Sequence, residues 1–226
     1  MQASSISRLV AFAIVCAAGL ALAQPSHAGF AGKRSHRATG SEIAGAVGPN
    51  GGRGIHAGGW MGDGNGGAIH ASGGAYSGPA GSAVRGSATH WGSDGSVTHK
   101  GGHSVQGANG GYDNGHNSWA RNPDGSGNVA WENHGQGANG GKLDSTGGFS
   151  RDANGNVTGS SQTSASGARG SYDGSTASAN GTTTHDTDYT AANGDSYQGE
   201  TSYTKGQGYT HSGTCKDASG NVISCH

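Results

Sequence analysis

The sequence has very few large aliphatic residues. Beyond residue 28, the remaining 198 positions hold one Leu, four Ile, seven Val and two Phe. Ordinary globular domains contain far more of these residues, and a fraction below about 20% usually indicates disorder when the net charge is high. The net charge here is only -1 with His neutral, so the charge half of that disorder signature is missing. We therefore expect no conventional enzyme core, although four Trp and seven Tyr can form a thin aromatic one.

Glycine is abundant and occupies 48 of the 226 positions. Each Gly inside a helix costs about 1 kcal/mol relative to Ala. A helix-rich fold is therefore excluded.

The first 28 residues have the segment order of a secretory signal peptide. Arg8 follows a short polar start, an apolar run spans residues 9–23, and the triplet Ser26-His27-Ala28 suits a signal peptidase. The run is shorter than the about 20 residues of a membrane-spanning helix. We expect cleavage after Ala28, with Ala23 as the second choice. The product would be secreted or periplasmic and would have no membrane span.

Cysteine is also scarce. Beyond the predicted signal peptide only Cys215 and Cys225 remain, in the segment CKDASGNVISC. An even pair of Cys in an exported protein predicts a disulfide, and two free thiols are the alternative. Folding the segment about Gly220 would place the two Cys directly opposite each other on antiparallel strands, close to the geometry of a disulfide.

The chain contains an internal repeat. QGANGG occurs at 106–111 and again at 136–141, and a degenerate SGARGS follows at 166–171. The spacing is 30 residues, which is typical of repeat architectures. Between these segments the unit reads aromatic-x-Arg, turn, Asn-Val.

This unit predicts a β-hairpin, because Asp-Gly and Asn-Gly between short alternating runs are the strongest local hairpin signals. Folding each run about its turn predicts which residues face each other across the strands. The expected pairs are Trp91 with Thr98, Trp119 with Trp131, and Arg151 with Thr158. A further turn is expected at 192–194, between Tyr189 and Tyr197.

Isolated hairpins are marginal in water, so we expect successive units to pair or stack. The predicted fold is all-β, an extended array of short hairpins, meandering or solenoid-like, over residues 82–226 with a C-terminal disulfide hairpin. Residues 29–81 show no alternation and are predicted to be a glycine-rich flexible segment. The alternative is a chain that is partly disordered until it assembles.

Histidine is the most prominent candidate for chemistry, with twelve in the chain. A two-residue Asp94-Gly95 turn would place His90 opposite His99 on one face, with His103 nearby, and such imidazoles can bind Cu²⁺ or Zn²⁺. No Cys-x-x-Cys or His-Glu-x-x-His spacing supports a dedicated site. The alternative is dispersed, exposed His with only weak metal binding and no cofactor.

Motifs of catalysis are missing from the sequence. It has no GxxxxGK[ST], no GxSxG and no EF-hand loop, and only three Glu lie beyond residue 28. We therefore expect no enzyme. Basic residues are too few to suggest nucleic-acid binding. A contact surface is instead expected from the aromatic residues of the hairpin region, namely Trp91, Trp119, Trp131 and Phe149.

The QGAN segments resemble the Gln-Gly-Asn phrasing of curli-type amyloid repeats, but the length and apolar spacing of that pattern are absent, so no family is assigned. Polar strands with low charge favour edge-to-edge β assembly. We expect a secreted, non-catalytic structural or surface-interaction protein that acts in a matrix, in adhesion or in self-assembly. Its partner would be itself or a cell-surface or matrix component, carbohydrate included. The alternative is a periplasmic, histidine-based metal-binding protein.

Overall fold

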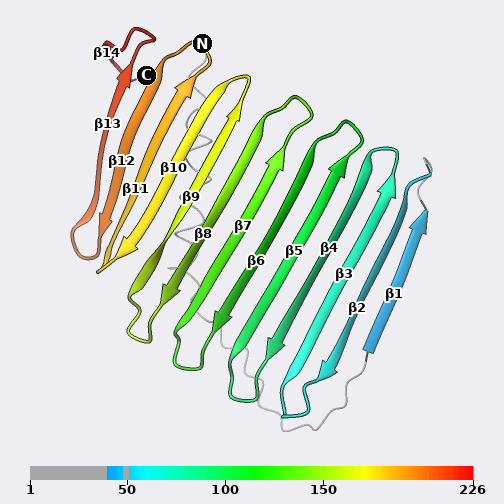
Figure 1. Ribbon diagram of the computed structural model, residues 1–226. Helices are drawn as coiled ribbons and strands as arrows, with labels where there is room; N and C mark the ends of the chain where they lie inside the picture. The colour runs from blue at the N-terminus through cyan, green and yellow to red at the C-terminus, as the bar shows by residue number, and fades with distance from the viewer. Residues whose placement is uncertain (1–39, 48–50, 226) are drawn as a thin grey trace. The chain divides into compact units, whose positions relative to one another are not determined.

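The protein forms one antiparallel β-sheet, seen in a computed structural model that describes residues 40–47 and 51–225 (Figure 1). Fourteen strands follow one another in chain order, and each is hydrogen-bonded to the next. The strands are β1 (Gly40–Val47), β2 (Arg53–Gly62), β3 (Ala68–Gly78), β4 (Gly81–Trp91), β5 (Val97–Gly107), β6 (Tyr112–Arg121), β7 (Gly127–Gln136), β8 (Lys142–Arg151), β9 (Val157–Gly167), β10 (Gly170–Ala179), β11 (Thr182–Ala191), β12 (Ser196–Thr204), β13 (Gly208–Lys216) and β14 (Val222–Ile223). The predicted all-β hairpin array is confirmed, and it takes the meander form.

Helices are absent from the described residues, so this part of the chain offers no helix long and apolar enough to cross a membrane. The predicted signal peptide, residues 1–28, lies outside the described residues.

Seven of the turns share one design of five residues. The amide of the first residue donates to the carbonyl of the fifth, and the amide of the fourth donates to the carbonyl of the first. The fourth residue is always glycine, with φ between 78° and 90°, a region that side chains disfavour. These glycines are Gly95, Gly110, Gly125, Gly140, Gly155, Gly194 and Gly220.

The first five of these turns begin fifteen residues apart, at Gly92, Gly107, Asn122, Gly137 and Asp152. One strand and one turn together fill this spacing, so the 30-residue repeat of the sequence spans two strands. Side chains alternate between the faces along a strand. Because fifteen is odd, residues fifteen apart lie on opposite faces, and only a spacing of thirty returns to the same face.

The turn design changes the register that the sequence predicted. A two-residue Asp-Gly or Asn-Gly turn was expected, but three residues lie between the closing pair, and a different loop length shifts every pair of the hairpin. The partners predicted for Trp91 and Arg151 were therefore wrong. The partner predicted for Trp119 was also wrong, because that hairpin is centred on Asp124 and not on Gly125. The turn expected between Tyr189 and Tyr197 is present. The observed partners are Val97 for Trp91, Val129 for Trp119, Val157 for Arg151 and Tyr197 for Tyr189.

The predicted flexible segment, 29–81, is also wrong where the structure describes it. Residues 40–47, 53–62 and 68–78 form strands, and β2 pairs with β3 at ten positions. Glycine gives these strands little intrinsic β-propensity, and their ladders hold them in place. Residues 29–39 lie outside the described residues.

The predicted disulfide is present between Cys215 and Cys225. Direct opposition of the two Cys was wrong, because Cys215 pairs with Ile223 across the short β13–β14 ladder. The hairpin is centred on Ser219 instead of Gly220, which moves the register by two residues.

The two faces of the sheet differ in chemistry. Paired residues share a face, as do residues two apart along a strand. These rules place all four Trp, Phe149 and six Tyr on one face of β2–β13. We call it the aromatic face; its rings are Trp60, Tyr76, Trp91, Trp119, Trp131, Phe149, Tyr172, Tyr189, Tyr197, Tyr203 and Tyr209.

The opposite face, here called the polar face, holds most of the charge. Ten of the fourteen Asp, Glu, Lys and Arg residues in β2–β13 lie on it. The aromatic face has only Arg85, Asp113, Arg121 and Arg151, and the last two end their strands. The sheet therefore separates aromatic side chains from charged ones.

Candidate binding surface

Several rings of the aromatic face lie over glycine positions. A Cβ atom added at Gly147 would meet the ring of Trp131 from the neighbouring strand. Added at Gly199 or Gly213, it would meet the ring of Tyr197. Because glycine has no side chain, these rings settle against the backbone. The rings therefore lie close to the backbone over these strands.

Neighbouring rings also contact one another. The ring centroids of Trp60 and Trp91 are 5.1 Å apart with planes inclined by 25°, and those of His99 and Trp119 are 5.6 Å apart at 15°. Tyr203 and Tyr209 approach to 4.7 Å at 41°. Such aromatic pairs contribute about 0.5–1.5 kcal/mol each beyond their buried area. Stacking thus supplies part of the cohesion that a thick aliphatic core supplies elsewhere.

The four residues predicted to form a contact surface all lie on the aromatic face. Trp91 and Trp119 are each 36% exposed and can touch a partner. Phe149 is buried, with 6% of its surface exposed, and its ring stacks on Trp131 at 6.0 Å between centroids. Phe149 therefore supports Trp131 instead of forming the outer surface.

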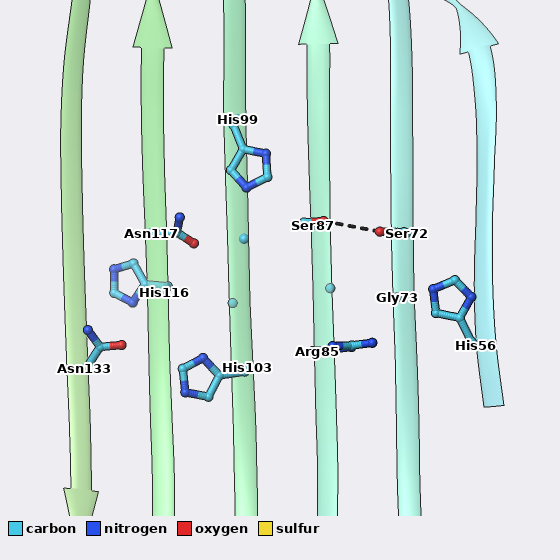
Figure 2. Close-up of a pocket in the computed structure, with 13 residues that line it drawn as sticks. His56, Ser72, Gly73, Arg85, Ser87, His99, His103, His116, Asn117 and Asn133 are labelled. Atoms are coloured by element: carbon cyan, nitrogen blue, oxygen red, sulfur yellow. Dashed lines mark hydrogen bonds between the residues drawn. The ribbon is translucent and has the colours of Figure 1, made fainter. Parts of the chain in front are cut away.

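A polar hollow of about 570 Å³ interrupts the aromatic face over β2–β7 (Figure 2). Serine and glycine line its floor, and the hydroxyls of Ser72 and Ser87 lie 3.3 Å apart. Imidazole, amide and guanidinium groups surround them, and Arg85 makes no ion pair with any described residue. The polar side chains of the aromatic face around the hollow are His56, Arg85, His99, His103, Asn117 and Asn133. His116 also borders the hollow, but its side chain lies on the polar face beside Glu132.

The structure does not bring the three predicted metal ligands together. His90 pairs with Thr98, and His99 pairs with Thr89, so His90 and His99 lie on opposite faces. The predicted opposition of His90 and His99 is wrong because the turn between them has three residues instead of two. His103 shares the aromatic face with His99.

Each of these imidazoles has another partner. His90 Nε2 lies 2.8 Å from Asp63 Oδ2, and this hydrogen bond is the main reason why the pKa of Asp63 lies below its usual value. His99 Nδ1 lies 2.8 Å from the Thr89 hydroxyl, and His103 Nε2 lies 3.0 Å from Asp113 Oδ2. Among residues 40–47 and 51–225, no group of three His, Cys, Asp or Glu side chains is arranged to hold a metal ion.

The polar face carries an ionic cluster that the sequence did not reveal. His134 lies between two carboxylates, with Nδ1 2.6 Å from Asp144 Oδ1 and Nε2 2.6 Å from Glu132 Oε1. The hydrogen bond to Asp144, followed by that to Glu132, raises the pKa of His134 above its ordinary value. His134 faces Asp144 across the β7–β8 ladder. The sequence indicates this pair only when the register of the hairpin is known.

The chain has no match among known proteins: no family model, curated protein or solved structure matches it. Its surface chemistry is therefore the evidence for function. The aromatic face offers broad stacking and van der Waals contact, whereas the hollow offers hydrogen-bond donors and acceptors. Both suit non-covalent binding of a large partner.

Proposed function

We propose that this is a secreted, non-catalytic structural or surface-interaction protein whose aromatic face is its contact surface. The observation that carries the proposal is the separation of side chains between the two faces. The cores of protein interfaces are depleted in Lys, Glu and Asp and enriched in Trp, Tyr, Phe and Arg. The aromatic face has that composition, because three of its four charged residues are Arg and none is Lys or Glu.

Two features of the chain support export and a role outside the cytoplasm. The N-terminal sequence has the order of a signal peptide. A structural disulfide, here between Cys215 and Cys225, persists in oxidising compartments. The partner would be the protein itself or a component of a cell surface or matrix, and stacked rings would also suit the faces of sugar rings.

The test begins with export of the full chain from a bacterial host and N-terminal sequencing, with Gly29 expected as the first residue. The exported protein is then assayed for self-association and for co-sedimentation with cell envelopes and insoluble polysaccharides. Trp119→Glu should abolish the binding that is found, while Ser118→Glu, the adjacent residue on the polar face, should leave it unchanged. Failure to bind itself or any of these materials would refute the proposal, as would equal effects of the two variants.

A further inference from the structure

Among residues 40–47 and 51–225, no second layer covers the aromatic face. Stable domains pack at least two layers of secondary structure around a core, but all the described strands belong to one sheet. Large apolar side chains of this face remain exposed, with 46% for Trp60, 46% for Leu143 and 77% for Tyr209. Phe149 is the one large hydrophobic side chain among the described residues that is buried.

We infer that the aromatic face is the interface of a homodimer in which two copies of this chain pack sheet against sheet. The inference rests on the proposed function, in which this face is the contact surface, and it names the partner as a second copy.

The size of the face is the first argument for a second copy. Strands β2–β13, about 4.8 Å apart and each about ten residues long with a rise of about 3.3 Å, give roughly 1,900 Å² of sheet. A stable complex of standard size buries about 800 Å² per partner. Less than half of the aromatic face would therefore suffice, and another copy provides a face of matching extent.

The form of the face is the second argument. Figure 1 shows β2–β8 running side by side with little change in direction. Extended sheets with little twist are unusual and are typically stabilised by stacking on another sheet. The rings over Gly147, Gly199 and Gly213 lie close to the backbone. A thin side-chain layer of this kind is needed when two sheets pack about 10 Å apart.

The charges of the face are the third argument. Besides Arg121 and Arg151 at strand ends, it holds one guanidinium, on Arg85 of β4, and one carboxylate, on Asp113, the second residue of β6, which contacts His103. These groups have opposite sign and lie on either side of β5. In a two-fold dimer each copy presents both groups to the other, so the interface is electrostatically self-complementary.

The test is sedimentation velocity on the exported protein over a dilution series, with tryptophan emission recorded on the same samples. All four Trp lie on the aromatic face, so dissociation should expose them together. We expect twice the mass of one chain at micromolar concentration, and a red shift of the emission at the dilution where the mass halves.

Matched variants show which face of the sheet forms the dimer interface. Leu143→Glu places a charge on the aromatic face of β8 and should weaken the dimer at least about tenfold. Ser150→Glu places the same charge on the polar face of β8 and should leave it unchanged. Tyr209→Glu is a second aromatic-face variant, at a side chain so exposed that the fold should tolerate the change. Circular dichroism checks that each variant is folded.

Three results would overturn the dimer. They are a monomer at every concentration up to about 100 µM, a dimer weakened by Ser150→Glu but not by the aromatic-face variants, and dissociation without any shift of emission. A monomer that binds a polysaccharide or an envelope through the aromatic face would refute the dimer and leave the proposed function standing. A monomer that binds none of these would refute both.

Discussion

At the scale of single residues, glycine on the aromatic face provides space for a ring. Gly147 and Gly148 are adjacent on β8 but lie on opposite faces. A Cβ at Gly147 would come within 2.5 Å of the Trp131 ring and 2.6 Å of Ser161 Cβ, whereas at Gly148 the nearest atom, a backbone oxygen, is 3.4 Å away. The two positions thus differ in available space far more than in backbone conformation.

Gly147→Ala should therefore destabilise the protein by about 1–3 kcal/mol, the usual cost of overpacking, and should change the emission of Trp131. Gly148→Ala should cost less than about 0.5 kcal/mol. Urea unfolding at fixed protein concentration measures both. Equal losses for the two variants would mean that the ring does not rest on the glycine.

His134 makes the second residue-scale prediction. Its pKa is raised in the folded protein, so its contribution to stability is present below its ordinary pKa of 6.5 and is lost as the pH rises through the raised value. His134→Gln should flatten the decline in the urea midpoint as the pH rises above 6.5. An unchanged decline in the variant would show that another group causes it.

At the scale of the element, the five-residue turn decides what the sequence could predict. Hairpins, turn positions and the disulfide followed from local signals, because Asp-Gly and Asn-Gly specify a tight turn. The register did not follow, because the same dipeptides fit loops of two or three residues. The one additional residue in the loop places His90 and His99 on opposite faces. The glycine-rich strands β2 and β3 were missed because neighbouring ladders, not their own side chains, hold them.

The aspartates of these turns predict sensitivity to acid. The Asp152 carboxylate accepts hydrogen bonds from the side chain and backbone amides of Asn156, and these bonds lower the pKa of Asp152 below its ordinary 3.8. Three further turn aspartates have lowered pKa values for similar reasons: Asp94, Asp124 and Asp217.

Because these pKa values are lowered by folding, the stability that they add is present above pH 3.8 and is lost as the pH falls through the lowered values. The urea midpoint should therefore drop steeply below about pH 4. Asp152→Asn should make that drop shallower, since one titrating group is removed. A drop of the same steepness in this variant would contradict the assignment.

At the scale of the whole molecule, each strand is hydrogen-bonded only to its sequence neighbours, so stability should be nearly a sum of adjacent pairings. Deletion of residues 127–156 removes two strands and two turns and brings Val157 into the place of Gly127, on the same face. Deletion of 127–141 brings in Lys142 instead, which belongs to the opposite face.

We expect the thirty-residue deletion to remain soluble, with a β-type circular dichroism spectrum and cooperative unfolding. The fifteen-residue deletion should aggregate, because every following strand would present its aromatic side chains to the polar face of the preceding strands. Comparable folding of both variants would show that the face assignment does not govern stability.

The odd spacing of the turns also constrains how a gene for such a protein can change in length. Duplication or loss of thirty codons in register adds or removes a complete hairpin and keeps the chemistry of both faces. Each such step changes the width of the sheet by about 9.6 Å, twice the strand spacing. Steps of fifteen codons would be selected against, so related genes should differ in length by whole units of thirty codons.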